Sequence, residues 1–370
     1  MSSLQLVFPL VLIFNLIFII QHYSCDAQDL KRCRFDAIYQ LGDSISDTGN
    51  SIVEIPQAYH ARFPYGQTIN KATGRPSDGF LMIDYIAQSA GLPLLEPYEN
   101  PNSSFSHGVD FSVAGVTAST VKTLIKWHIP LPYSNNSLSV QVKWLKKHLS
   151  TFCNVKKDCH RKLKSALFMV GTIGANDYDF AFFQGKSIEE VKKVMVPRVI
   201  QTIKTAIQKV IDYGAFRVVV PGIFQLGCTP SLLTAFSSNN SVYDAHGCLK
   251  DYNDFFMYHN NHLQVALQKI RKKNPHVRII YGDIYGALQW VLDNLSNLGF
   301  KSFKKSCCGI GGKFNFSPSL KKMCGAHGVP ICSNPKEHVF WDGGHFSHQA
   351  SKYLSKWLIK DILPKLHCST

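Results

Sequence analysis

The sequence of 370 residues has few acidic side chains, with 25 Asp and Glu against 40 Lys and Arg and a formal net charge of +15. It also contains no internal repeat, no stretch of low complexity and no segment typical of a linker, so we expect a single domain. Charged residues make up only 18% and hydrophobic residues 45%, which argues against disorder and predicts a sizeable core.

The chain lacks a basic stripe interleaved with aromatic residues, which a nucleic-acid groove would require. Its basic residues are scattered in pairs such as Lys146-Lys147 and Lys272-Lys273, which we assign to solvated helix faces. We therefore expect no nucleic-acid partner. A basic secreted protein could still associate with polyanionic cell-wall material.

The apolar run at residues 4–20 is too short to favour a membrane span and is typical of a secretory signal peptide. No Lys or Arg precedes this run, and Asn15 interrupts it. With cleavage after Ala27, residues 1–27 form the leader, residues 28–370 form one domain, and no stable membrane anchor remains. We expect an extracellular location in the apoplast, with the vacuole as an alternative. Five Asn-x-Ser/Thr sequons fit this route, at Asn102, Asn135, Asn239, Asn294 and Asn315.

Ten cysteines remain once the leader is removed, and an even number in a secreted chain predicts disulfides. Spacing does not determine their connectivity. Short loops make Cys153–Cys159 and Cys228–Cys248 plausible pairs, and a third group could staple one long loop, at Cys307, Cys308, Cys324 and Cys332. This group lacks paired C-x-x-C units, which disfavours zinc, and we expect neither a metal nor a cofactor.

Five apolar runs are typical of strands, at residues 35–41, 109–113, 166–170, 216–220 and 277–281. The later runs alternate with helical patterns. Ser187-Ile188-Glu189-Glu190 is a capping-box pattern for a helix ending near Gly214, which Pro197 should kink or break. Two more helices are predicted at residues 252–273 and 347–362. The alternation predicts an α/β fold with helices on both faces of a central, mostly parallel sheet of about five strands.

Three candidate site residues each follow one of the first three predicted strands: Ser44, Gly115 and Asn176. Ligands of open parallel sheets bind beyond the carboxyl ends of the strands, so we expect these residues to meet at one edge. A serine hydroxyl becomes a good nucleophile only when a base takes its proton. The candidate base is His345, which is three residues after Asp342 in a glycine-rich turn before a helix.

The same five residues suffice for acyl transfer. Asp342 would accept the second imidazole N–H of His345, and the oxyanion would be met by the Ser44 and Gly115 backbone N–H groups and the Asn176 amide. Each residue also has a plainer explanation, as a helix cap, a turn residue or a stabilising pair.

Neighbouring charged residues are expected to be structural. Asp47 should accept hydrogen bonds around the Ser44 turn, Asp177 should bond within its own loop, and Arg75 could pair with Asp78.

The order of these motifs resembles that of the GDSL, or SGNH, esterases. The first and last blocks are Gly42-Asp43-Ser44 and Asp342-x-x-His345, and the middle blocks begin at Gly108 and Gly174. Further matches are typical of the plant branch, such as Arg62-Phe63-Pro64-Tyr65-Gly66 and Cys307-Cys308-Gly309.

This resemblance implies a flavodoxin-like three-layer α/β/α fold and a monomeric enzyme that acts on a small-molecule ester. It also implies a catalytic triad of Ser44, Asp342 and His345, with an oxyanion hole at Ser44, Gly115 and Asn176. Within the plant branch the motifs are most similar to those of alkaloid-ester and choline-ester hydrolases. That likeness favours acetyl or aromatic-acid esters of specialised metabolites.

Other functions fit parts of the pattern. An acyltransferase would use the same triad and pass the acyl group to an alcohol, depending on how dry the pocket is. A non-catalytic binding protein on an esterase scaffold is disfavoured because all the candidate catalytic residues are present. A triacylglycerol lipase is least favoured, since no long exposed apolar lid is evident. Gly344 and Ser112 stand where plant members often have Thr and Ala.

Overall fold

The computed structural model describes residues 29–129, 132, 134–153 and 155–368. The predicted leader, residues 1–27, lies outside these residues, so the domain boundary at residue 28 stays a prediction. Among the described residues, five strands form one sheet in the order β2-β1-β3-β4-β5, and every neighbouring pair is parallel. The strands are β1 Ala37–Leu41, β2 Gly108–Asp110, β3 Ala166–Val170, β4 Arg217–Pro221 and β5 Arg278–Gly282.

Each predicted strand is confirmed, with boundaries shifted by up to three residues. The helices are α2 Asn50–Glu54, α3 Met82–Ala90, α4 Val121–Lys126, α5 Leu138–Leu149, α6 Lys156–Lys162, α7 Ala175–Phe183, α8 Ile188–Val194, α9 Val196–Asp212, α10 Pro230–Phe236, α11 Lys250–Lys273, α12 Ile284–Asp293 and α13 His348–Leu366. Short 3₁₀ helices are η1 Asp29–Cys33, η2 Tyr59–Ala61, η3 Gln67–Ile69, η4 Leu226–Cys228, η5 Leu320–Lys322 and η6 Pro335–Glu337.

The helix predicted from Ser187 is two helices, as its proline suggested. The Ser187 hydroxyl caps α8 by accepting the Glu190 N–H at 3.1 Å. Pro197 lies in the first turn of α9, where its missing N–H leaves no helical hydrogen bond unmade, and the break falls at Met195.

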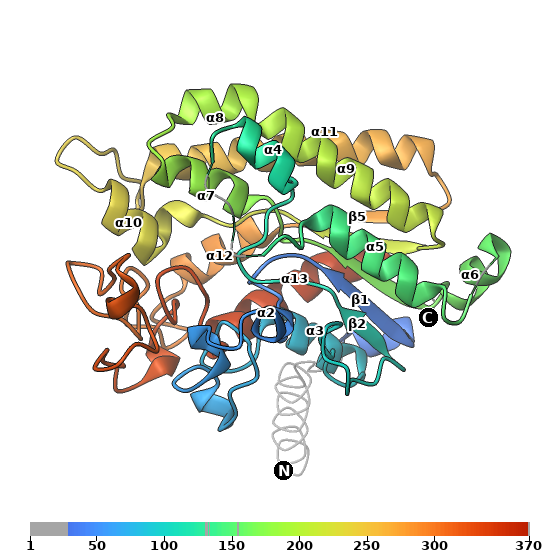
Figure 1. The fold of residues 1–370 in the computed structure, drawn as a ribbon, viewed down its shortest axis with the longest axis horizontal. Helices are drawn as coiled ribbons and strands as arrows, with labels where there is room; N and C mark the ends of the chain where they lie inside the picture. The colour runs from blue at the N-terminus through green and yellow to red at the C-terminus, as the bar shows by residue number, and fades with distance from the viewer. Residues whose placement is uncertain (1–28, 130–131, 133, 154, 369–370) are drawn as a thin grey trace, which may run out of the picture.

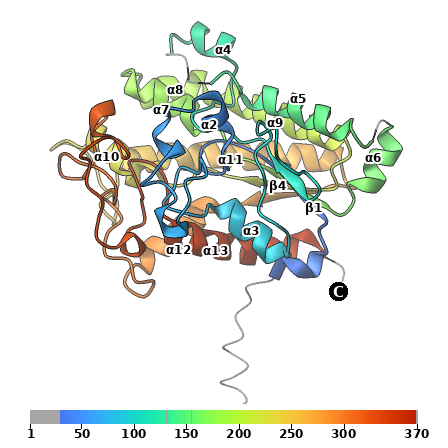
Figure 2. The ribbon, with the colours of Figure 1, turned by 60° about the horizontal axis from the view of Figure 1, so that its bottom comes forward.

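The sheet is covered on both faces, which confirms the three-layer fold. Helices α5, α9 and α11 cover one face, and α3, α12 and α13 cover the other (Figures 1 and 2). Strands β1 and β3 are wholly buried, as expected for a parallel sheet between two helical layers. Helix α9 directs its apolar face into this core through Val199, Ile203, Ile207 and Val210.

The strand order has a consequence for the site. The chain passes from β1 to β2 on one side and then crosses from β2 to β3 on the other side of β1, so the switch point of the sheet lies between β1 and β3. Ligands of doubly wound sheets bind beyond the carboxyl ends of the strands at such a point. Ser44 follows β1, and Asn176 opens the helix after β3.

All ten predicted disulfide cysteines are paired, as Cys33–Cys368, Cys153–Cys159, Cys228–Cys248, Cys307–Cys332 and Cys308–Cys324. Among the residues that the structure describes, two side-chain groups are close enough to hold a metal, and both contain such cysteines, whose sulfurs are already bonded. Within the described part of the chain, no helix combines the length and apolar character of a membrane span.

Candidate active site

Ser44 lies half-buried in a tight turn directly after β1. The turn is closed by a hydrogen bond from the Ser46 N–H to the Asp43 carbonyl at 3.2 Å. The Asp43 carboxylate accepts the Ile45 N–H at 3.1 Å and the Thr172 hydroxyl at 2.8 Å. Because Thr172 follows β3, Asp43 fastens the Ser44 turn to the neighbouring loop at the switch point.

Asp47 has the structural role predicted for it. Its buried carboxylate accepts four backbone N–H groups at 2.7–3.2 Å, from Gly49, Asn50, Ser51 and Ala114. The last of these donors precedes Gly115, so Asp47 joins the Ser44 turn to the loop after β2.

The loop that carries Gly115 is in direct contact with the first turn of α7, which carries Asn176. Gly115 has a φ of 76°, in the left-handed region, and a Cβ added there would meet no atom within 4 Å. Its backbone therefore borders open space. The Asn176 amide donates one hydrogen bond to the Val116 carbonyl at 2.7 Å, and its second N–H remains to bind a ligand.

The sequence predicted that Asp177 bonds within its own loop, but its partners lie in another loop. Its buried carboxylate accepts the backbone N–H groups of Ala118 and Ser119 at 2.8 and 3.0 Å. These donors belong to the loop after Gly115. A buried carboxylate needs several donors, and this turn of irregular backbone supplies them.

Asp342 and His345 are in direct contact. The His345 Nδ1 lies 2.8 and 2.9 Å from the two Asp342 oxygens, which favours the tautomer with its proton on Nδ1 and leaves Nε2 free to accept one. Asp342 Oδ1 also accepts the Gly344 and His345 backbone N–H groups, both at 2.9 Å. The His345 side chain is 30% exposed, so a ligand can reach the ring.

The charges of this pair shift both pKa values. Burial lowers the pKa of His345, but the negative charge and hydrogen bond of Asp342, with the charges of Asp43 and Asp47, leave it above the usual 6.5. Burial raises the pKa of Asp342, but the charge and hydrogen bonds of His345 leave it below the usual value. Both shifts favour a carboxylate beside a basic imidazole.

Tyr65 is a contact of Asp342 that sequence reasoning missed. Its hydroxyl donates to Asp342 Oδ2 at 2.9 Å, and the residue is buried. Its ring packs edge-on against Trp341 and His60. Tyr65 belongs to the Arg62-Phe63-Pro64-Tyr65-Gly66 motif, but nothing local in the sequence indicates a partner 277 positions away.

The disulfide-linked loop supports the strand-like segment that leads to Asp342. The Cys307 and Cys308 N–H groups donate to the Phe340 and Trp341 carbonyls at 3.1 and 2.7 Å. Disulfides join these two cysteines to Cys332 and Cys324, as the sequence suggested for this group. The cross-linked loop therefore supports the residues directly before Asp342.

The Arg75–Asp78 ion pair predicted from the sequence is wrong. Arg75 forms a buried bidentate pair with Asp84 on α3, at 2.7 and 2.8 Å. Asp78 instead accepts the Thr68 hydroxyl at 2.5 Å and the His348 N–H, at the start of α13, at 2.6 Å. Asp78 therefore joins its turn to α13 across 270 positions, which local spacing does not reveal.

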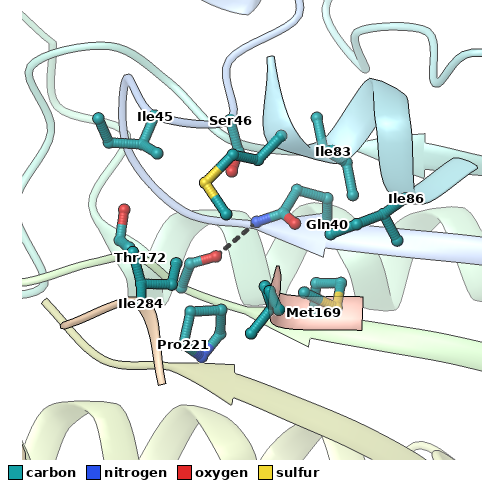
Figure 3. A pocket seen from close by; sticks show the side chains of 12 residues that line it. Gln40, Ile45, Ser46, Ile83, Ile86, Met169, Thr172, Pro221 and Ile284 are labelled. Atoms are coloured by element: carbon teal, nitrogen blue, oxygen red, sulfur yellow. Dashed lines mark hydrogen bonds between the residues drawn. The ribbon is translucent and has the colours of Figure 1, made fainter. Parts of the chain in front are cut away.

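A small cavity lies beneath the Ser44 turn (Figure 3). The buried Gln40 amide crosses it and donates to the Leu41 and Gly171 carbonyls, both at 2.8 Å, which joins the ends of β1 and β3. Ile45 and Met169 are among the residues that line the cavity. Its volume is about 10 Å³, which is room for roughly one water molecule. It is therefore too small to be a substrate pocket.

The structure thus brings the candidate residues to one edge of the sheet without joining all of them. Asp342 contacts His345, and Asn176 contacts the Gly115 loop. Among the described residues, Ser44 forms no hydrogen bond with His345. Catalytic hydrogen bonds are often long until substrate binds, so this arrangement remains compatible with a triad.

Comparison with known proteins gives consistent results. The model of the GDSL-like lipase/acylhydrolase family matches residues 38–358. Acetylajmalan esterase 1 of Rauvolfia serpentina is 43% identical over 343 residues, which cover 91% of this chain and 89% of the relative. A GDSL esterase/lipase of Arabidopsis thaliana is 41% identical over 348 residues, or 91% and 90% of the two chains.

Among solved structures, a phospholipase A1 from Streptomyces albidoflavus aligns with a TM-score of 0.31 at 12% identity, covering 87% of this chain and 98% of the other. The family match spans the whole sheet, from β1 into α13, and contains all the candidate site residues. The chain therefore belongs to the GDSL-like lipase/acylhydrolase family and is a carboxylic ester hydrolase.

Proposed function

We propose that this esterase is a secreted serine hydrolase that cleaves small-molecule esters through an acyl-enzyme. Ser44 is the nucleophile, His345 its base, and Asp342 the carboxylate that orients the base. The observation that carries the proposal is the contact of Asp342 with His345 Nδ1 at 2.8 Å, at the sheet edge where Ser44 follows β1. That contact leaves Nε2 able to accept a proton.

Acylation begins when His345 Nε2 takes the proton of the Ser44 hydroxyl as its Oγ attacks the ester carbonyl carbon. The resulting tetrahedral oxyanion collapses, the bond to the alcohol oxygen breaks, and His345 returns its proton to the leaving alcohol. Water then attacks the acyl-enzyme by the same route and releases the acid. Throughout, Asp342 stabilises the imidazolium by its charge and by the Nδ1 hydrogen bond.

The oxyanion hole consists of the backbone N–H groups of Ser44 and Gly115 and the side-chain amide of Asn176. The Asn176 bond to the Val116 carbonyl supports this role, because it fixes the amide beside the Gly115 loop before substrate arrives. Preorganised donors of this kind stabilise the charge that develops in the transition state.

Acetyl or aromatic-acid esters of plant specialised metabolites are the substrates we favour. The similarity to acetylajmalan esterases supports this choice, since those proteins are named for an acetyl ester. Secretion is supported by the apolar N-terminal run and by the pairing of ten cysteines. Three sequon asparagines are exposed, which suits glycosylation: Asn102, Asn135 and Asn239. The other two, Asn294 and Asn315, use their amides to bond backbone carbonyls.

A fluorophosphonate probe tests the nucleophile. The wild-type protein should be labelled, Ser44→Ala should not, and the matched variant Ser46→Ala, two residues along the same turn, should be. Circular dichroism checks that both variants are folded. Labelling of a folded Ser44→Ala protein would refute the assignment.

The reaction is tested with a panel of esters of graded acyl length, with and without competing alcohols. We expect free acid as the main product in every mixture. A product that is mainly the ester of the added alcohol would instead identify an acyltransferase.

A further inference from the structure

The neighbourhood of Ser44 is rich in carboxylates although the protein is strongly basic. Its net charge is +15, yet six buried or half-buried aspartates surround the proposed active site: Asp43, Asp47, Asp110, Asp177, Asp179 and Asp342. A carboxylate without a donor is costly to bury, so each needs an explanation.

Five of the six carboxylates have donors that satisfy them. Those of Asp43, Asp47, Asp177 and Asp342 are described above. The fifth, Asp110, accepts the Thr48 N–H and hydroxyl at 2.7 and 2.9 Å and the Ser112 N–H at 2.9 Å. Asp342 orients His345, and the other four are structural, because their bonds hold the loops of the site together.

Asp179 is the exception. Its Oδ1 is buried and has no hydrogen-bond partner among the described residues, and no described Lys, Arg or His forms an ion pair with it. The residue as a whole is half-buried. Burial, and then the charge of Asp43, raise the pKa of Asp179 to about 8. Asp179 is therefore an unsatisfied acid, one helical turn from Asn176 on α7.

Its position on α7 is also informative. Asp179 lies three residues after Asn176, so the two share one face of the helix about 4.5 Å apart along its axis. The same face continues with Phe180 and Phe183. A ligand whose carbonyl oxygen meets Asn176 would therefore present its next few atoms to Asp179 and then to aromatic rings.

Those rings belong to a stacked cluster. Phe183 stacks on Phe236 with centroids 5.5 Å apart, and Phe236 stacks on Tyr252 at 4.8 Å. Phe183 is 48% exposed, so the cluster reaches the surface. Asp179 lies four residues before Phe183 on α7, so its side chain neighbours this cluster on the same helix face. A carboxylate beside aromatic faces is the surrounding that organic ammonium ions prefer.

We propose that Asp179 is a specificity-determining residue that binds a positively charged amine on the substrate, so that the enzyme prefers esters bearing an ammonium group. An ammonium group beside the carboxyl stabilises its ionised form by its charge. A neutral substrate of the same shape leaves the acid unsatisfied. This inference rests on the proposed function, because it places the ester at Asn176.

Two esters of nearly equal shape test the preference: acetylcholine and its uncharged analogue 3,3-dimethylbutyl acetate. The variant Asp179→Asn keeps the size of the side chain and removes its charge. Its matched control is Asp251→Asn, an exposed carboxylate in the first turn of α11 that directly precedes Tyr252.

In Asp179→Asn, kcat/KM for acetylcholine should fall by roughly tenfold or more, as expected for losing a charge-assisted contact, and kcat/KM for the neutral ester should change little. The control should affect neither ester, and the melting temperature of Asp179→Asn should not fall. An equal loss on both esters, or no loss on either, would overturn the proposal.

Binding of tetramethylammonium, measured by calorimetry on Ser44→Ala protein, gives a readout independent of turnover. Binding should weaken by a similar factor when Asp179→Asn is added, and equal binding would overturn the proposal. If the wild-type protein hydrolyses no ester but binds this cation through Asp179, only the proposed function fails. If it hydrolyses esters and Asp179 has no effect on the cation, only the present inference fails.

Discussion

Asn176→Ala separates catalysis from stability more sharply than any other single change in this site. The substitution removes two things at once: the hydrogen bond to the Val116 carbonyl at 2.7 Å, and the second amide N–H proposed to meet the oxyanion. These losses appear in different measurements, so their sizes can be compared.

The structural loss should be small. One neutral hydrogen bond contributes about 0.5–1.5 kcal/mol to stability. In a chain of this length that corresponds to a fall in melting temperature of no more than about 3 °C.

The catalytic loss should be much larger. An oxyanion-hole donor contributes mainly in the transition state, so removing it should lower kcat by roughly 10²–10³ and change KM little. The Ser44 and Gly115 N–H groups should keep the residual rate above that of Ser44→Ala.

Both quantities should be measured on the same preparation, with Asn274→Ala as a control. Asn274 donates an amide hydrogen bond to a backbone carbonyl in the same way, to Ile270 at 3.0 Å, but lies at the end of α11 away from the site. Its loss should lower the melting temperature and leave kcat per folded molecule unchanged. If Asn176→Ala behaves like this control, the amide is a structural turn residue and the oxyanion-hole proposal is refuted.

Three further results are expected. Tyr65→Phe removes a hydrogen bond to the Asp342 carboxylate, worth about 1.5–3 kcal/mol for a charged acceptor, and should lower kcat roughly tenfold with little change in KM, measured by steady-state kinetics over a pH series. Gly344→Ala should raise unfolding stability by about 0.4–1 kcal/mol in urea titrations, because Gly344 is not in the left-handed region and a Cβ there meets no atom within 4 Å. Activity and stability should respond oppositely to pH. His345 must be unprotonated to act as a base, so kcat/KM should rise through a pKa above 6.5. The pKa of Asp110, raised by burial and then by a neighbouring acid from 3.8 to about 8, should make the melting temperature fall across that window.

The opposite pH trends follow from the sign of each shift. Between pH 3.8 and about 8 the folded state holds the Asp110 proton and the unfolded state releases it, so rising pH favours unfolding. A melting temperature that rises over this range would show that Asp110 is ionised in the fold. A rate that is flat from pH 5 to pH 8 would argue against His345 as the base. Gly344→Ala with reduced stability, or Tyr65→Phe with an unchanged kcat at every pH, would contradict the other two predictions.

The sheet and its covering helices could be predicted from the sequence because their signals are local. The apolar runs gave all five strands, and the positions of Ser187 and Pro197 gave the break between α8 and α9. Burial on both faces imposes an almost continuous apolar composition on parallel strands, so these segments stand out in any reading of the chain.

The polar contacts of the site were less accessible. Asp342 and His345 are three residues apart, and their pairing follows from a single turn. By contrast, Tyr65 donates to Asp342 across 277 positions in the sequence. Arg75 pairs with Asp84 and not with Asp78, because α3 places Asp84 against its guanidinium group. Such contacts depend on the relative placement of segments, which hydrophobic patterning does not specify.

The aspartates next to the candidate catalytic residues explain how the loops of the site are held in fixed positions although their backbone is irregular. Asp43 binds the Ser44 turn to Thr172 after β3, Asp47 binds it to the Gly115 loop, and Asp177 binds the helix of Asn176 to that same loop.

The three contacts close a triangle among the loops that follow β1, β2 and β3, so no loop can shift without breaking a buried, charge-assisted hydrogen bond. Loops are usually the mobile parts of a fold, yet oxyanion donors must be held in place before the reaction. Buried carboxylates that accept backbone N–H groups from neighbouring loops satisfy both conditions. Asp179, whose Oδ1 has no hydrogen-bond partner among the described residues, is by contrast the carboxylate that we propose for a ligand.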